Sequence, residues 1–149
     1  GRQKPTMLIF YRGGWGPYCN KHLAELARVE PRLVEMGYQV VALSADRPEK
    51  ARETQGEFGY DYRLLSDHEM RAARAFGIAF RVDEETIERY EGYGIDLQDA
   101  SGRKHHLLPV PSVFIADTKG MIRFVYSNPD YKIRLGGDEI VAAARQALR

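Results

Sequence analysis

The first 44 residues place one long amphipathic stretch between two short apolar runs, and this order constrains the fold more than any other feature. Met7–Tyr11 and Tyr38–Ser44 are short, apolar and bounded by turn residues, which is typical of buried strands. Between them, Pro17–Met36 places apolar residues at three- and four-residue steps, which predicts a helix. A strand, a helix and a strand with short connections form a βαβ unit with parallel strands.

Two further helices are expected after this unit, from about Pro48 to Phe58 and through Met70 to Phe76. The pairs Asp46/Glu49 and Ser66/Glu69 have capping-box spacing, which predicts that they open these helices. Arg63–Leu65 lies between the two helices as a short apolar segment.

The C-terminal part returns to a regular pattern. Ser112–Ala116 and Met121–Tyr126 flank a turn that ends in glycine, which predicts an antiparallel hairpin. A helix with one apolar face is expected from Asp138 to Arg149. Together these elements predict an α/β domain with a central mixed sheet and helices on both faces.

The segment 78–108 interrupts this order before the hairpin. It is rich in Glu, Asp, Tyr and Gly, and we expect a loop with one short helix near Glu84–Tyr90. Its apolar content is too low to build a core of its own. We therefore interpret it as an insertion within one domain spanning residues 1–149.

Composition narrows the classes of partner. The 149 residues are 44% hydrophobic with a net charge of +1, and no basic block or long apolar run stands out. Neither nucleic acid nor a membrane is therefore expected as a partner. The chain has one cysteine, so no disulfide can form within it, and a single thiol suits a reducing compartment such as the cytoplasm.

The chemistry is concentrated in the segment FYRGGWGPYCN, residues 10–20. A strand ends, two glycines turn the chain, and a helix begins near Pro17, which suits a first helical turn. A helix N-terminus stabilises an anion placed there, so a cysteine at position 16 would be a reactive, exposed thiolate. Cys19 lies one turn deeper, where a cysteine is usually shielded.

This segment resembles the W-C-P-Y-C motif of thioredoxin-like proteins in the alkyl hydroperoxide reductase/thiol-specific antioxidant family. Three further segments resemble the same family in the same order: YGIDL at 93–97, LPVPSVFIAD at 108–117 and NPDYKIRL at 128–135. The resemblance implies a thioredoxin fold with thiol-dependent oxidoreductase or peroxidase chemistry, without a cofactor. Its partners would be thiols, disulfides and hydroperoxides.

The resemblance also implies a substrate groove. Val110-Pro111 is expected to form a cis peptide bond facing the cysteine motif, with the Val110 backbone pairing to an extended substrate. Trp15, Pro17 and Tyr18 flank the motif and are assigned to the same groove, although core packing alone would also suit such aromatic residues.

Three departures from the family pattern matter. Peroxiredoxins carry a proline and a threonine seven and three residues before the reactive cysteine, and counting from position 16 reaches Ile9 and Gly13. Pro111 stands where the family has an arginine. Gly16 stands at the position of the first cysteine, and glycine offers no nucleophile. We therefore expect the chain to be inactive or impaired.

Several roles remain open for Cys19. It could be a single active thiol, a resolving cysteine without its partner, or a small buried residue. His22 lies three residues further along the helix, where it could tune the thiol or join it as a metal ligand, but no further ligands stand out and no metal is expected. Arg12 could supply charge to the site or simply end a strand, and His105-His106 is expected to be a solvated pair.

Three functions follow from these alternatives. The first is a thiol-dependent oxidoreductase or peroxidase scaffold with Gly16 at the nucleophile position. The second is a binding or regulatory module that keeps the cis-proline groove without catalysis. The third is a one-cysteine activity through Cys19, with glutathione as a candidate thiol. The oligomeric state is left open by the sequence.

Overall fold

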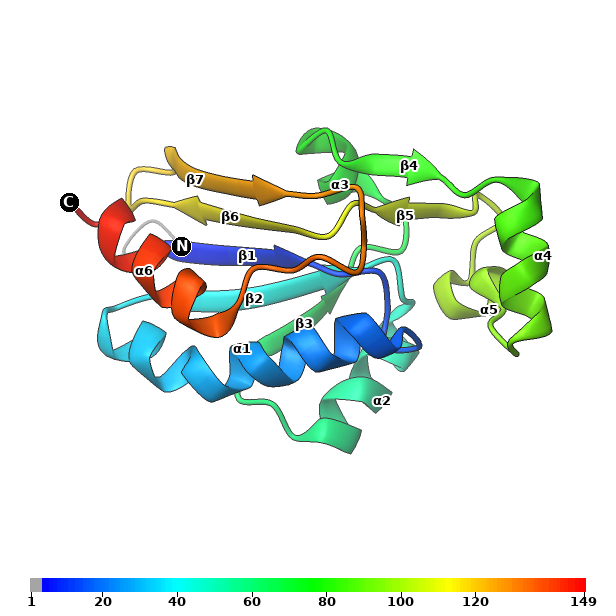
Figure 1. The fold of residues 1–149 in the computed structure, drawn as a ribbon, viewed down its shortest axis with the longest axis horizontal. Helices are drawn as coiled ribbons and strands as arrows, with labels where there is room; N and C mark the ends of the chain where they lie inside the picture. The colour runs from blue at the N-terminus through cyan, green and yellow to red at the C-terminus, as the bar shows by residue number, and fades with distance from the viewer. Residues whose placement is uncertain (1–3) are drawn as a thin grey trace.

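The computed structural model describes residues 4–149, and its elements follow the predicted order (Figure 1). The strands are β1 (Thr6–Phe10), β2 (Gln39–Ser44), β3 (Arg63–Ser66), β4 (Ala79–Arg81), β5 (Leu107–Pro109), β6 (Ser112–Ala116) and β7 (Ile122–Ser127). The helices are α1 (Pro17–Glu35), α2 (Pro48–Phe58), α3 (Arg71–Ala75), α4 (Glu84–Gly92), α5 (Leu97–Ser101) and α6 (Gly137–Ala147).

The main sheet has the strand order β3-β2-β1-β6-β7. β1 runs parallel to β2, and β2 runs parallel to β3, as the βαβ unit requires. β6 is antiparallel to both β1 and β7, so the predicted hairpin is confirmed. The predicted mixed sheet flanked by helices is therefore also confirmed. None of the helices among residues 4–149 is long and apolar enough to cross a bilayer.

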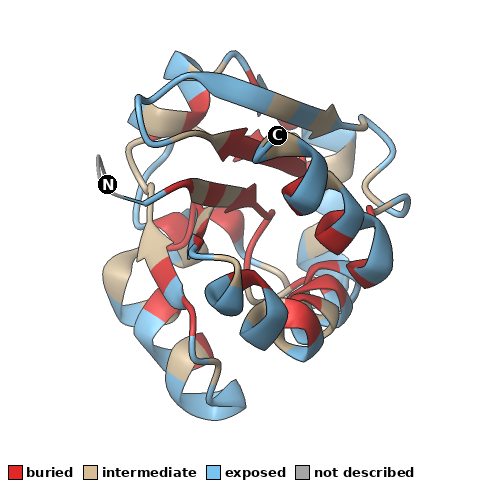
Figure 2. Ribbon diagram, turned by 90° about the vertical axis from the view of Figure 1, so that its left-hand side faces the viewer, coloured by how far each residue is buried: buried red, intermediate tan, exposed pale blue. Residues whose placement is uncertain are grey.

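Two apolar clusters form the core, because side chains of β1 alternate between the two faces of the sheet. Met7, Ile9 and Tyr11 pack in the first cluster with the apolar faces of α1 and α6. Phe10 packs in the second cluster against Phe114 of β6. Figure 2 shows the buried residues along the central strands and on the inward sides of the helices, whereas the edge strand β7 is mostly exposed.

The segment 78–108 is more regular than predicted. It forms two short helices, α4 and α5, and an antiparallel pair of strands, β4 and β5. Its few apolar residues build no separate core, but they extend the second cluster of the main domain. These residues are Ile78, Val82, Ile87, Leu97 and Leu108. The short helix expected near Glu84–Tyr90 is α4, whereas α5, β4 and β5 are too short to show a periodic pattern and were not predicted.

Both predicted capping boxes are wrong. Helix α3 is capped by Asp67 and not by the predicted pair Ser66/Glu69. The Asp67 carboxylate accepts hydrogen bonds from the backbone N–H groups of Ala72 and Ala73 at 3.0 and 2.9 Å. Helix α2 begins at Pro48 without a side-chain cap. The carboxylate of Asp46 turns away from that helix and accepts a hydrogen bond from the Gly14 N–H instead.

The predicted cis bond at Val110-Pro111 is also wrong, because no peptide bond among the described residues is cis. The trans form is the ordinary preference of an X-Pro bond. The Val110 backbone is already paired within the chain: its N–H donates to the Ile78 carbonyl at 2.7 Å, and its carbonyl accepts from the Ser112 hydroxyl at 2.7 Å. An extended substrate would have to displace these hydrogen bonds.

Candidate active site

The candidate site lies at the turn between β1 and α1, at the end of the sheet where α4 and α5 also lie (Figure 1). Gly16 is the N-cap of α1 and has an extended backbone, and Pro17 occupies the first turn as predicted. Gly13 has a φ of +156°, and a Cβ there would collide with the Trp15 indole. Glycine at position 13 therefore allows the turn to place the indole over the start of α1.

Cys19 is the third residue of α1, and its sulfur lies at the floor of a small cavity. The residue is only 1% exposed. Its Sγ accepts hydrogen bonds from the Arg12 backbone N–H at 3.2 Å and from Arg134 Nη2 at 3.1 Å. A backbone donor, a guanidinium and the N-terminus of a helix all stabilise negative charge on this sulfur.

Arg134 was not identified as a site residue from the sequence. It lies between β7 and α6, in the segment NPDYKIRL, where the sequence shows a family resemblance but no signal for a role at the sulfur. Its Nε donates to the Tyr131 carbonyl at 2.5 Å, which fixes the side chain. The neighbouring Leu135 carbonyl lies 3.2 Å from the His22 Nε2 of α1. The segment is thus tied to α1 beside Cys19.

The cavity above Cys19 has a volume of about 150 Å³ and mainly aromatic walls. Its lining residues are Arg12, Trp15, Gly16, Pro17, Tyr18, Cys19, Tyr90, Tyr93, Ile95, Tyr131 and Arg134. The motif residues named from the sequence therefore meet here. Val110 and Pro111 do not line this cavity; Pro111 lines a neighbouring one, which shares Arg12, Tyr90 and Tyr131 with it.

Arg12 belongs to the site rather than merely ending a strand. Only 7% of the residue is exposed, and its guanidinium carbon lies 4.2 Å from the ring centre of Tyr131. The rings of Trp15 and Tyr90 lie at 5.2 and 5.3 Å, so three aromatic rings surround the cation. Its Nη2 also donates to the Tyr90 hydroxyl.

Asp46 stabilises the turn between β1 and α1 through its side chain. Its Oδ2 accepts a hydrogen bond from the Gly14 N–H at 2.8 Å, and the residue is almost completely buried. Burial raises the pKa of this carboxyl to about 6, although the Gly14 hydrogen bond and Lys50 act in the opposite direction.

His22 is buried and interacts with the Leu135 carbonyl, not with the thiol. Burial, with repulsion from Arg134, lowers the pKa of its imidazole to about 4. No group of three potential metal-ligating side chains occurs among residues 4–149.

The sequence predicted that His105 and His106 form a solvated pair, and this prediction is wrong for His105. That residue is half-buried, and its Nε2 lies 2.7 Å from the His68 carbonyl.

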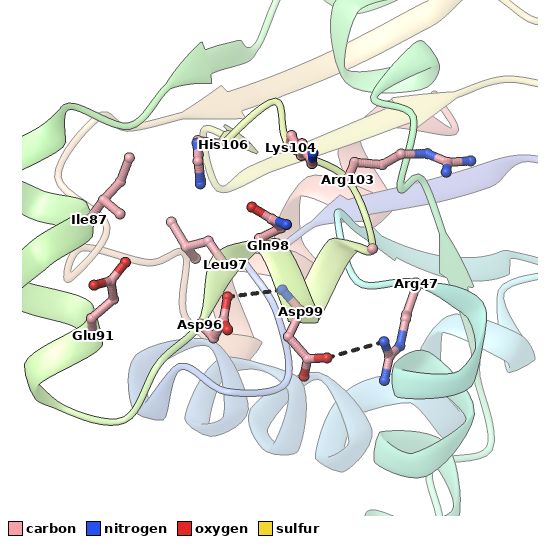
Figure 3. Close-up of a pocket in the computed structure, with 11 residues that line it drawn as sticks. Arg47, Ile87, Glu91, Asp96, Leu97, Gln98, Asp99, Arg103, Lys104 and His106 are labelled. Carbon is pink, nitrogen blue, oxygen red and sulfur yellow. Dashed lines mark hydrogen bonds and ion pairs between the residues drawn. The ribbon is translucent and has the colours of Figure 1, made fainter.

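A second, larger cavity of about 750 Å³ lies over α5, and its lining includes Lys104 and His106 but no cysteine (Figure 3). Two of its acidic side chains are engaged within the chain, and one of them, Asp99, accepts a hydrogen bond from Arg47 at 3.3 Å. Asp96 is used as the N-cap of α5, accepting from the Asp99 N–H at 3.0 Å. The small cavity over Cys19 is therefore the better candidate for chemistry.

A mixed sheet, a glycine turn and a cysteine in the first turn of the following helix define a thioredoxin-like thiol protein. The sequence model of the AhpC/TSA family matches residues 1–125. The chain belongs to this family of peroxiredoxin-like oxidoreductases with an antioxidant role. No curated protein sequence gives a significant match.

Solved structures with this fold include several peroxiredoxins. The peroxidoxin BcpB of Mycobacterium tuberculosis is 21% identical, with a TM-score of 0.70 over 95% of this chain and 79% of that one. The bacterioferritin comigratory protein of Xanthomonas campestris is 17% identical, with a TM-score of 0.75 over 99% and 82%. AhpC of Enterococcus faecalis is 22% identical, with a TM-score of 0.72 over 97% and 75%. At these identities the likeness supports the fold alone.

Proposed function

We propose that this chain reduces small organic hydroperoxides, with Cys19 as the nucleophile and an external thiol as the reductant. The observation that carries the proposal is the pair of hydrogen bonds to the Cys19 sulfur, from the Arg12 N–H at 3.2 Å and from Arg134 at 3.1 Å. Both donors are directed at the sulfur, which is the atom that attacks the substrate in cysteine chemistry. The family, and the alkyl peroxide reduction named for the Xanthomonas protein, support hydroperoxide as the substrate.

The reaction needs no group that the site lacks. The thiolate attacks the distal peroxide oxygen, the O–O bond breaks, and the alkoxide leaves and is protonated to the alcohol. Arg134 Nη1 is buried and has no partner among residues 4–149, so it can donate to the leaving oxygen as negative charge develops there. Two external thiols then reduce the sulfenic acid to the thiol, releasing water and a disulfide.

Counting back from Cys19 finds neither of the two family residues, so the role of Cys19 rests on the hydrogen bonds to its sulfur. The family resemblance implies a proline and a threonine seven and three residues before the reactive cysteine. From Cys19 these positions are Arg12 and Gly16. Gly16 then stands where the family has threonine, rather than where it has a nucleophile. Pro111 stands at the position of the family arginine, and a guanidinium reaches the sulfur from Arg134 in a later segment of the chain instead.

The proposal is tested by trapping the oxidised sulfur. The chain is treated with cumene hydroperoxide and dimedone, and the adduct is located by mass spectrometry. We expect one adduct on Cys19, peroxide consumption that depends on added thiol, and neither in Cys19→Ser. A folded chain whose Cys19 remains a thiol in excess peroxide would contradict the proposal.

The prediction that Gly16 marks a lost thiol partner has its own test. A Cβ at Gly16 would lie 3.8 Å from the Cys19 Cβ, a separation typical of disulfides, and would meet no atom closer than 3.7 Å. We therefore expect Gly16→Cys to form an internal disulfide with Cys19 under mild oxidation. The measurement is loss of both alkylatable thiols, reversed by dithiothreitol. Two thiols that stay free after oxidation would show that the turn does not accept the pair.

The alternative of a non-catalytic module has less support. That function relied on a free Val110 backbone facing the cysteine motif, and this backbone is paired with Ile78 and Ser112. No observation specific to this chain favours it.

A further inference from the structure

The cavity over Cys19 combines two cations with apolar walls. Arg12 and Arg134 both line it, and no acidic residue does so among residues 4–149. Neither arginine forms an ion pair within that part of the chain. The Arg134 guanidinium donates a hydrogen bond to the Cys19 sulfur, whereas Arg12 donates to it only through its backbone N–H.

The charge of Arg12 is buried with incomplete compensation. The residue is 93% buried, its Nε is a buried donor without a partner among the described residues, and its Nη2 reaches only the neutral Tyr90 hydroxyl. The three surrounding rings attract the cation but accept no strong hydrogen bond. A buried charge of this kind is costly unless an anion pairs with it.

The buried carboxylate of Asp46 does not fill this role. It belongs to the same turn, but it accepts from the Gly14 N–H, and within residues 4–149 it is not within ion-pair distance of Arg12. Among residues 4–149 no carboxylate forms an ion pair with Arg12, so an anionic ligand is the group that would complete its surroundings.

We propose that the cavity takes a ligand with a carboxylate, which pairs with the Arg12 guanidinium while its apolar body packs against Trp15 and Tyr90. The carboxylate belongs either to the hydroperoxide or to the reducing thiol. As a statement about substrate, this inference rests on the function proposed above. Arg12 is then a residue that determines specificity, while its backbone N–H, which every substitution except proline keeps, donates to the sulfur.

The first test compares two alkylating reagents that differ in charge. Iodoacetate carries a carboxylate and iodoacetamide does not, so the ratio of their rates on Cys19 reports attraction of the anion. We expect Arg12→Gln to lower this ratio about tenfold, as for loss of a charge-assisted hydrogen bond. Arg134 is unchanged in this variant, so the difference reports Arg12 alone.

The matched control is Arg89→Gln, which removes the same charge from α4 at the neighbouring cavity. We expect it to leave the ratio within about twofold of the wild type, since an exposed charge is screened by salt. An unchanged ratio in Arg12→Gln, or an equal fall in both variants, would overturn the proposal. The measurement needs no peroxide, so it can succeed even if the proposed peroxidase function fails.

A second measurement covers the case in which Cys19 is too shielded to alkylate. Trp15 is the only tryptophan and lines the cavity, so its fluorescence reports occupancy. We expect 4-isopropylbenzoate to change the emission at concentrations at least about tenfold lower than its neutral amide, and Arg12→Gln to abolish the difference. Equal titrations for acid and amide would overturn the proposal.

Turnover then distinguishes the two sources of the carboxylate. One arm compares cumene hydroperoxide with its para-carboxylate derivative, and the other compares 3-mercaptopropionamide with 3-mercaptopropionate. If the acid is turned over faster than the neutral compound in the first arm, and Arg12→Gln removes the difference, the carboxylate belongs to the hydroperoxide. The same result in the second arm shows that the carboxylate belongs to the reducing thiol. A preference for the acid in neither arm would contradict the proposed substrate class.

Discussion

Replacing Arg134 by glutamine is expected to slow the oxidation of Cys19 by hydroperoxide about 100-fold. The variant loses a charge-assisted hydrogen bond to the sulfur at 3.1 Å, and interactions of this kind contribute about 1.5–3 kcal/mol. It also loses the unpaired Nη1 donor, which can stabilise the leaving oxygen in the transition state. The rate is measured by stopped-flow with cumene hydroperoxide, using the change in Trp15 fluorescence or competition with a second peroxidase.

Two further variants make this result specific. Arg134→Lys keeps the charge but not the planar fork of donors, so we expect an intermediate rate. Arg145→Gln removes an arginine from the exposed face of the nearby helix α6 and should react like the wild type. Unfolding temperatures should stay close together across the three variants. A folded Arg134→Gln variant that reacts at the wild-type rate would remove Arg134 from the mechanism.

The second large effect concerns stability in acid, where Asp46 and His22 are expected to act in opposite directions. Burial lowers the pKa of His22 from 6.5 to about 4, so the unfolded chain binds more protons in that range and stability falls as pH falls. Burial raises the pKa of Asp46 from 3.8 to about 6, so the folded chain binds more protons there and stability rises as pH falls. Each shift corresponds to about 3 kcal/mol, at about 1.4 kcal/mol per pH unit.

Single substitutions should therefore separate two contributions that nearly cancel in the wild type. Relative to the wild type, Asp46→Asn should lose about 3 kcal/mol of stability between pH 6.5 and pH 4, and His22→Gln should gain about as much. The free energy of unfolding is measured in urea at several pH values. Only differences from the wild type are compared, because the contributions of the other carboxyl groups to the pH dependence then cancel. Stability curves that run parallel for all three proteins would contradict both pKa shifts.

Most of the fold followed from periodicity, because long elements carry strong patterns. The βαβ unit, the 112–126 hairpin and the C-terminal helix are all found where apolar spacing indicated them. The helix starts were less predictable, since capping depends on where a carboxylate points. Asp67 caps α3, whereas Asp46 faces the Gly14 N–H rather than the helix that follows it. Spacing alone cannot distinguish these orientations.

The site was predictable only in its local part. The residues from Trp15 to Cys19 are contiguous, so a single motif placed all of them at one turn. Arg134 lies 115 positions from Cys19, and its contact with the sulfur depends on how the segment after β7 crosses α1. The role of Arg12 depends on two rings from distant segments, Tyr90 and Tyr131. No pattern within one segment carries such contacts.

The floor and the wall of the cavity are contributed by separate parts of the chain, and this has an evolutionary consequence. The sulfur and its donors belong to the β1–α1 turn and to the segment before α6, whereas Tyr90, Tyr93 and Ile95 come from α4 and the residues after it. Changes in α4 can reshape the mouth of the cavity without disturbing the reactive sulfur or the five-stranded sheet. Related proteins can therefore differ in the ligands that enter the cavity while they keep the same reaction at the sulfur.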